Sequence, residues 1–280
     1  MQNWHGFTAQ ASYTYSKTID NATEVFSTGT GGNTNAFAQN PFNISGGERA
    51  TSGLSYPNVF GLLWVYDLPF YSGQQGLKGN LLGGWEINGT YRYTSGEPWT
   101  VVQTRQSGSL CDPTDWTGSS RDACRPILSN ASAPFTSVGQ CTSASAPGCG
   151  LVDLVSGNPL ALSAAHWIIN DPTAAQFFGS PFLGVGRNTQ RGEPISTANL
   201  SVYKNLKLRE RLTLQLQATA FNILNNQWLG VPTSPRVDRV TQGTFGTTQF
   251  NPNGDAEFAG NQTTDGLTRR RLQFGVKFIF

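Results

Sequence analysis

The chain has 280 residues, of which 38% are hydrophobic and 13% are charged, whereas charged residues make up about 25% of an ordinary soluble domain. No stretch approaches the roughly 18 consecutive apolar residues that a transmembrane helix requires, so a membrane-spanning form of this chain would have to cross as β-strands. The formal net charge of +2 comes without a cluster of Lys or Arg, which excludes nucleic acid as a partner.

Apolar and polar side chains alternate in five segments before the carboxy terminus, as they do along half-buried strands. In chain order the apolar rows are Phe7, Ala9, Ala11, Tyr13 and Tyr15; Phe60, Leu62, Trp64, Tyr66 and Leu68; Trp85, Ile87, Gly89, Tyr91 and Tyr93; the shorter Ala198, Leu200 and Val202; and Leu212, Leu214, Leu216, Ala218 and Ala220. None of these rows repeats at the 3.6-residue period of a helix. We therefore predict five strands here, and a short helix only within residues 162–179.

The last residues predict a sixth strand with the same alternation. Its apolar row consists of Leu272, Phe274, Val276, Phe278 and Phe280, and polar residues or glycine stand between them. A tilted transmembrane strand needs about 9 to 11 residues of this pattern. The sequence therefore predicts a membrane-spanning strand up to Phe280.

The predicted connections alternate between long and short, in chain order 17–57, 69–80, 95–197, 207–211 and 223–268. Outer-membrane barrels show the same asymmetry, with short periplasmic turns and long extracellular loops. We therefore predict an all-β fold, an antiparallel up-and-down transmembrane β-barrel, with 95–197 as its longest extracellular loop. The rows give about six strands, fewer than the eight of the smallest natural barrels, so we expect an incomplete barrel segment.

The four cysteines, Cys111, Cys124, Cys141 and Cys149, all fall within the longest predicted loop. Their even number and local spacing indicate two disulfides formed in an oxidising compartment. A zinc site is the alternative, but the cysteines form no CxxC pair and have no nearby histidine. We predict the pairs Cys111–Cys124 and Cys141–Cys149, because each closes a small loop, and two other connectivities stay open.

The sequence offers little material for catalysis, a cofactor or a metal. It has two histidines and lacks the GxSxG, HExxH and P-loop patterns, so we predict no enzymatic activity and no cofactor. Asp112, Asp115 and Asp122 match no EF-hand spacing and are interpreted as a solvated surface. The glycines and Arg187 within 184–188 superficially resemble a phosphate-binding motif, but without a preceding strand and a following helix a turn is the better interpretation.

Several segments together resemble the carboxy-terminal barrel of TonB-dependent receptors. They are GVGRNTQRGEPISTANLSVYKNLKLRERLTLQLQATAFNILNNQ (Gly184 to Gln227), RRLQFGVKFIF at the end of the chain, YTYSKTIDNAT (Tyr13 to Thr23) and VYDLPF (Val65 to Phe70). The resemblance is strongest to the Oar-like receptors, which carry an amino-terminal carboxypeptidase-regulatory-like domain. It implies an outer-membrane barrel of about 22 strands, a plug domain inside it, and energy-coupled import of a bulky ligand such as a glycan, a peptide or a metal chelate.

The chain departs from that family in lacking a plug and a TonB-contacting segment, and no secretory signal follows Met1. We therefore expect residues 1–280 to be the carboxy-terminal part of a longer receptor in the outer membrane of a Gram-negative bacterium. The implied partners are outer-membrane lipid, the TonB complex through the missing amino-terminal part alone, and the barrel-assembly machinery. The strand ending at Phe280 resembles the signal that this machinery reads.

One other class of protein is compatible with period-two strands and local disulfides. A secreted β-sandwich or propeller that binds carbohydrate has both features. The alternating loop lengths and the aromatic terminal strand favour the barrel over this alternative. Nothing in the loops is diagnostic of a particular ligand or of the residues that contact it.

Overall fold

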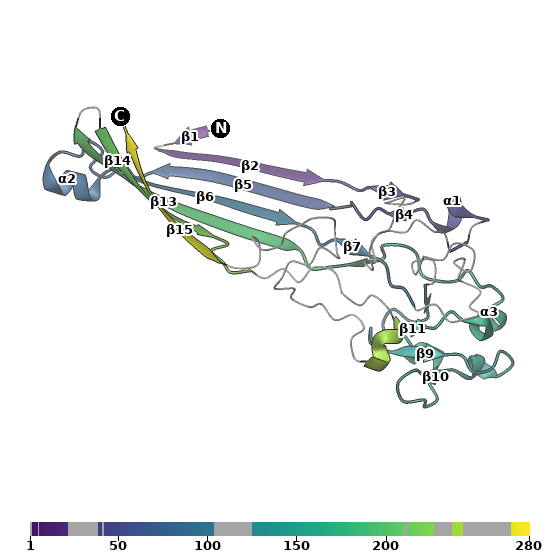
Figure 1. Cartoon of the computed structure of the whole chain (residues 1–280). Helices are drawn as coiled ribbons and strands as arrows, with labels where there is room; N and C mark the ends of the chain where they lie inside the picture. Colours follow the sequence, from purple (N-terminus) through teal and green to yellow (C-terminus); the bar gives the residue numbers. More distant parts are fainter. Residues whose placement is uncertain are drawn as a thin grey trace.

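The computed structural model describes residues 2–4, 6–21, 39–40, 42–103, 125–209, 212–226, 237–242 and 270–280. Its largest element is a seven-stranded antiparallel sheet (Figure 1). In spatial order its strands are β1 (Gln2–Trp4), β2 (Phe7–Tyr15), β5 (Asn58–Asp67), β6 (Trp85–Thr94), β13 (Ile195–Arg209), β14 (Leu212–Phe221) and β15 (Arg271–Ile279). This order follows the chain, so the sheet has up-and-down topology. Because β1 and β15 form its two edges, the sheet is open.

The pairing register places the predicted apolar rows on one face of the sheet. Ala11 stands opposite Leu62, and Leu62 stands opposite Tyr91. Toward the other edge of the sheet, Leu216 stands opposite Val276 on the same face. We call this side of the sheet the apolar face. The opposite side, the polar face, carries Gln10, Ser12, Asn88, Thr90, Asn199, Gln215, Gln217 and Gln273.

The large sheet buries no apolar core of its own. Among the described residues, every buried apolar side chain lies within 99–242 and outside the strands of this sheet. Many side chains of the apolar face are instead exposed, among them Tyr13, Tyr15, Trp85, Leu216, Leu272, Phe274, Val276 and Phe278. An exposed apolar surface that continues across neighbouring strands is unfavourable in water and fits a hydrocarbon environment.

The six predicted strands are all present, and one of them is longer than predicted. β13 runs for 15 residues instead of the short row from Ala198 to Val202, because β6 pairs with its first part and β14 with its second. The predicted start of the tight turn at residue 207 is therefore too early, because β13 extends to Arg209. After an irregularity at Lys207, the pairing continues to Arg209, which stands opposite Leu212.

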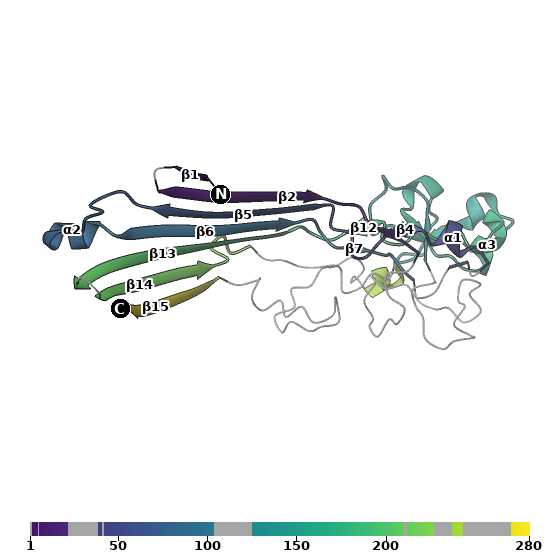
Figure 2. The ribbon, with the colours of Figure 1, turned by 90° about the horizontal axis from the view of Figure 1, so that it is seen from above.

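Long and short connections gather at opposite ends of the sheet (Figures 1 and 2). The turn end carries the β13–β14 connection and residues 68–84, and the loop end carries the segments that follow β2, β6 and β14. The 68–84 connection is longer than the predicted 69–80 and contains helix α2 (Gly76–Leu82). Sequence periodicity could not predict this helix because it is only two turns long and is bounded by glycines.

The helix expected within 162–179 is present as α3 (Pro172–Phe178). Asp171 caps it by accepting a hydrogen bond from the backbone N–H of Ala174, Pro172 occupies its first turn, and Gly179 ends it with a positive φ of 77°. The expectation that no other helix forms was wrong, because α1 (Ile44–Gly47) and α2 lie outside that range.

The segments at the loop end pack together into a folded unit that we call the loop assembly (Figure 2). It contains a four-stranded sheet, ordered β10 (Val152–Asp153), β9 (Val138–Gln140), β11 (Trp167–Ile168) and β8 (Ile127–Leu128). Two further pairs join β7 (Pro98–Trp99) to β12 (Gln190–Arg191) and β3 (Ile19–Asp20) to β4 (Ala50–Thr51), and 3₁₀ turns span Pro147–Gly150, Leu162–Ala164 and Val237–Gln242. One buried cluster consists of Trp99, Val101, Val138, Trp167, Ile169 and Val237. The long loops thus supply the core that the large sheet lacks.

Candidate functional site in the loop assembly

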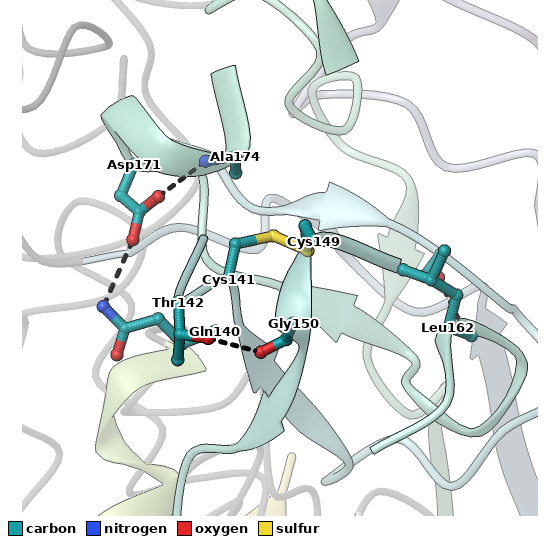
Figure 3. The surroundings of a disulfide bond; sticks show 9 residues. Gln140, Cys141, Thr142, Cys149, Gly150, Leu162, Asp171 and Ala174 are labelled. Carbon is teal, nitrogen blue, oxygen red and sulfur yellow. Dashed lines mark hydrogen bonds between the residues drawn. A yellow bond between two sulfur atoms is a disulfide. The ribbon is translucent and has the colours of Figure 1, made fainter. Parts of the chain in front are cut away.

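A disulfide closes the hairpin between β9 and β10 (Figure 3). Cys141 and Cys149, eight residues apart, are joined as the spacing predicted. Both cysteines are buried, in a second apolar cluster with Ile127, Leu151, Ala165, Ile168 and Ala174. Beside them, Gln140 Nε2 donates to Asp171 Oδ2 at 3.2 Å, which ties the hairpin to the start of α3. The other predicted pair, Cys111 and Cys124, lies outside the described residues.

Removing this disulfide is expected to loosen the hairpin locally. Closing a loop of this length restricts the unfolded chain by about 2–3 kcal/mol, so Cys141→Ser with Cys149→Ser should raise protease nicking within residues 140–163 by one to two orders of magnitude. The nicking rate of the oxidised protein provides the reference. Ser145→Ala is the control, because it removes an exposed hydroxyl in the same hairpin. It should leave the nicking rate unchanged. Equal rates in all three proteins would show that packing alone holds the hairpin.

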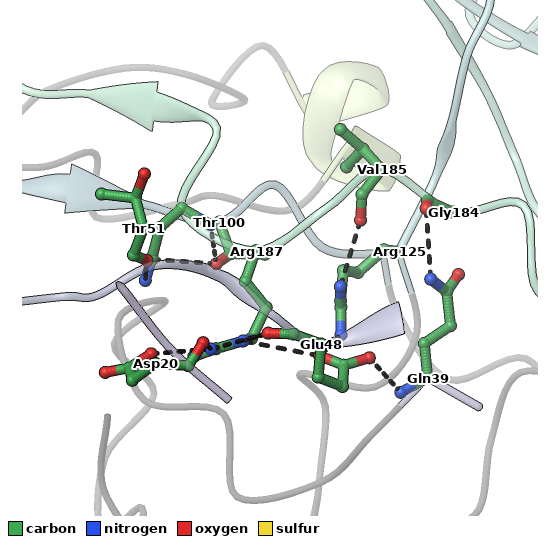
Figure 4. Close-up of polar contacts among 10 residues, drawn as sticks. Asp20, Gln39, Glu48, Thr51, Thr100, Arg125, Gly184, Val185 and Arg187 are labelled. Atoms are coloured by element: carbon green, nitrogen blue, oxygen red, sulfur yellow. Dashed lines mark hydrogen bonds and ion pairs between the residues drawn. The ribbon is translucent and has the colours of Figure 1, made fainter. Parts of the chain in front are cut away.

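A second structural centre surrounds Arg187, whose side chain is fully buried (Figure 4). Its Nη2 donates to Asp20 Oδ1 at 2.7 Å and to the Glu48 carbonyl oxygen at 2.8 Å, and its Nε donates to the same carbonyl at 3.1 Å. Asp20 ends β3 and Glu48 follows α1, so one guanidinium joins the 184–188 turn to the segment between β2 and β5. Charge-assisted hydrogen bonds in such a shielded place are strong and fix geometry.

Glu48 is the common partner of two arginines. Its Oε2 lies 2.5 Å from Nη2 of Arg125 and 3.5 Å from Nε of Arg187, and its Oε1 accepts the backbone N–H of Gln39 at 2.7 Å. Arg125 also donates to the carbonyl of Val185 at 3.2 Å. We call Asp20, Gln39, Glu48, Arg125 and Arg187 the loop junction. Two carboxylates, the buried Glu48 and the partly exposed Asp20, face the two buried guanidiniums, which offsets the cost of burying their charge.

Asparagines extend the loop junction toward the sheet. Asn188, with a positive φ of 54°, donates from Nδ2 to the Thr51 carbonyl at 2.8 Å, and its backbone N–H donates to Thr100 Oγ1 at 3.0 Å. Farther along, the backbone N–H of Asn222 donates to Asn199 Oδ1 at 2.9 Å, where β13 and β14 meet the loops. Of the segments that carried the family resemblance, Gly184 to Gln227 meets Tyr13 to Thr23 at the loop end through Arg187 and Asp20, whereas Val65 to Phe70 lies at the turn end.

Part of this site could be predicted from the sequence. The turn interpretation of residues 184–188 is confirmed, since Arg187 and Asn188 form a turn. The buried pairing was missed because Glu48 lies 77 residues from Arg125 and 139 from Arg187, and no local pattern links residues at such distances. The predicted acidic group, Asp112, Asp115 and Asp122, lies outside the described residues.

A hollow lies on the surface of the loop assembly next to the disulfide. It measures about 600 Å³ and is lined mainly by apolar side chains, Leu151, Pro159, Leu160 and Leu162 among them. Nearby, backbone N–H donation from Ser156 holds the pKa of Asp153 below its usual range. At the sheet boundary, burial and then the Glu97 carboxylate raise the pKa of Tyr56. The hollow offers apolar contact to a bound molecule.

Within the ranges that the structure describes, no three His, Cys, Asp or Glu side chains gather as a group that could hold a metal ion. Of the helices in those ranges, none has the length and apolar character needed to cross a membrane.

The architecture defines a class of protein. An up-and-down antiparallel sheet with one exposed apolar face, one polar face, and long connections at a single end is the arrangement of membrane β-barrels. A family model described as an outer membrane beta barrel domain matches residues 1–273. The chain belongs to this family, and its location is the outer membrane. No curated protein and no solved structure matches the chain significantly.

The family membership confirms the predicted fold class and location. It excludes the alternative of a secreted β-sandwich or propeller, as does the large sheet itself, which is single and follows chain order. The terminal row from Leu272 to Phe280 lies on β15 and just beyond it, along one edge of the sheet. The first four residues of that row face the same side as Ala220, Ala218, Leu216 and Leu214 of β14.

Proposed function

We propose that this chain is the carboxy-terminal barrel segment of a TonB-dependent receptor of the Oar-like group, and that it takes part in the uptake of a bulky ligand. The ligand is a glycan, a peptide or a metal chelate, captured by the loop assembly on the outer side of the membrane. Energy coupling would proceed through a plug and a TonB-contacting segment elsewhere in the receptor. The role of this segment is binding and gating, without covalent chemistry.

The open edges of the sheet support a larger barrel. β1 pairs with β2 only from Phe7 to Ala9, so the rest of that β2 edge, and the outer edge of β15, carry strand backbone that can pair further. In lipid each unsatisfied backbone group costs several kcal/mol. Additional strands between β1 and β15 would satisfy these groups. The family resemblance implies a barrel of about 22 strands, which would contain such strands.

The observation that carries the proposed function is the folded loop assembly. Its own apolar clusters and the buried loop junction hold three chain segments as one body at the loop end. A simple pore does not need so large a folded body at its mouth, whereas a receptor gains affinity when its binding loops are held in place before the ligand arrives.

Uptake assays in cells test this function. Cells that produce the full-length receptor would be supplied separately with fluorescent oligosaccharides, fluorescent peptides and ferric chelates, with TonB present or deleted. We expect uptake of at least one probe class to require both the receptor and TonB. Receptor-dependent uptake that persists without TonB would indicate a passive pore, and no receptor-dependent uptake in any class would reject the proposed substrates.

We also propose that the terminal row, Leu272, Phe274, Val276, Phe278 and Phe280, is read by the barrel-assembly machinery. Phe280 is 95% exposed and lies beyond the last paired residue of β15, so Phe280→Ala should change the stability of refolded protein by no more than about 0.5 kcal/mol. In cells the same change should lower insertion into the outer membrane several-fold. Ile279→Ala is the matched control, because Ile279 precedes Phe280 in the chain but lies on the opposite face of β15 from the terminal row. Unchanged insertion of Phe280→Ala would remove this role.

A further inference from the structure

We propose that helix α2 is a membrane-surface helix, which lies in the phospholipid interface at the turn end of the barrel. Neither the family nor the proposed uptake function assigns a role to this helix. The proposal follows from how α2 is fixed to the apolar face of the sheet, from the side chains it exposes, and from its charge.

Two residues of the apolar face tie down the carboxyl end of α2. Trp85, at the start of β6, donates from its indole Nε1 to the Leu81 carbonyl oxygen at 3.1 Å. Lys204 of β13 stands opposite Trp85, and its Nζ lies 5.2 Å from the Trp85 ring centroid and donates to the Gly83 carbonyl. The end of the helix is therefore held beside the lipid-facing side of the sheet, and Lys204 satisfies its charge there without entering lipid.

Aromatic rings mark the membrane boundary at the same level. Phe7 packs against Trp64 and Tyr66, with ring centroids 6.5 and 6.1 Å apart, and these rings share the apolar face with Trp85 near the turn end. Membrane barrels carry such aromatic girdles where hydrocarbon meets the polar headgroups. A helix hydrogen-bonded to Trp85 thus lies at the depth of the headgroups.

The side chains that α2 presents are apolar and uncovered. Leu77 is 91% exposed and Leu81 69% exposed, and their spacing of four residues places them on one side of the helix. Leu82, Phe70 and Tyr71 add further exposed apolar surface in the same connection. In water this patch would be unfavourable, whereas a short apolar helix side is stabilised in the interface of a bilayer.

The charge of the connection fits phospholipid rather than another protein surface. Between Asp67 and Glu86 the only charged residue is Lys78, and its side chain is exposed on α2. A single cation with no acidic neighbour is attracted to phosphate headgroups, to which anionic lipids add further attraction. The patch is also continuous, through Trp85, with the face that already contacts lipid.

Quenching by brominated lipid tests the proposal. Full-length receptor carrying Leu77→Cys or Leu81→Cys would be labelled with bimane and reconstituted in phosphatidylethanolamine–phosphatidylglycerol vesicles whose acyl chains are brominated near the headgroup. We expect quenching at both positions to be at least threefold stronger than at Val155→Cys, an exposed residue of the loop assembly. Labelling of the unsubstituted protein under the same non-reducing conditions provides the blank.

Val276→Cys, on the apolar face of β15, serves as the lipid reference. If this reference is quenched while positions 77 and 81 match Val155, the helix faces water, a plug or a second copy, and the proposal is overturned. Strong quenching at 77 and 81 that disappears when Trp85→Phe removes the hydrogen bond to Leu81 would further show that the sheet sets the position of the helix.

Discussion

Replacing Glu48 by alanine is expected to destabilise the loop assembly by about 3–5 kcal/mol, because it removes the carboxylate that Arg125 and Arg187 share in a buried site. Both guanidiniums are fully shielded from water. Once the carboxylate is removed, water can solvate their positive charges only if the junction opens. The backbone N–H of Gln39 would lose its acceptor as well.

Hydrogen exchange measures this effect segment by segment. In the Glu48→Ala protein, amides near residues 48–52 and 184–190 should exchange at least a hundredfold faster, while amides of β5 and β6 keep their protection. Glu193→Ala provides the control, because Glu193 is an exposed carboxylate at the same end of the sheet and its loss should stay within about 0.5 kcal/mol. Equal exchange in the two variants would mean that the junction contributes nothing to holding the loops.

Replacing Leu216 by arginine is expected to lower the stability of the refolded barrel by about 2–4 kcal/mol. Leu216 lies in the middle of β14 on the apolar face, opposite Val276 and Lys204, and a cation on the lipid-facing side of a membrane barrel is costly. Lys204 adds like-charge repulsion across the pair. The measurement is the free energy of unfolding of the full-length protein in phospholipid vesicles, by urea titration.

The neighbouring residue supplies the matched comparison. Gln215 lies on the polar face, where its Nε2 donates to Asn205 Oδ1 at 2.9 Å, so Gln215→Arg should lose about one hydrogen bond, or 0.5–1.5 kcal/mol. A water-filled interior accepts the new charge. If both substitutions destabilised the barrel equally, the assignment of the two faces would be wrong.

The strands could be predicted because their signal is local. Along β14 the alternation of Leu214, Leu216 and Ala218 with polar residues needs no knowledge of the neighbours, since the two sides of the strand contact different environments. β13 was predicted too short because lysine at 204 interrupts its apolar row. In the structure Lys204 reaches the Gly83 carbonyl, an interaction that only the fold reveals.

The loop assembly could not be predicted to the same extent. Strands of two or three residues, such as β8 and β11, are too short to show a period, and they form because Trp167 and Ile168 are buried between neighbours. The disulfide was accessible to sequence reasoning because Cys141 and Cys149 are close in the chain. The pairing of Glu48 with Arg125 and Arg187 could not be predicted, because these residues are far apart in the chain and form no local sequence pattern.

The loop junction also couples the movements of two long connections. Because it joins the segment between β2 and β5 to the segment between β6 and β13, these loops cannot move independently without breaking a buried ion pair. A ligand that displaced one of them would therefore displace the other.

The central claim is that the sheet crosses the outer membrane with the loop assembly outside the cell and α2 on the periplasmic side. A membrane-impermeant maleimide applied to intact cells tests it most directly, with Val155→Cys in the loop assembly and Lys78→Cys on α2, both exposed in the structure. We expect Val155→Cys to react in intact cells, and Lys78→Cys to react only after the outer membrane is permeabilised. Labelling of Lys78→Cys in intact cells, with Val155→Cys protected, would contradict it.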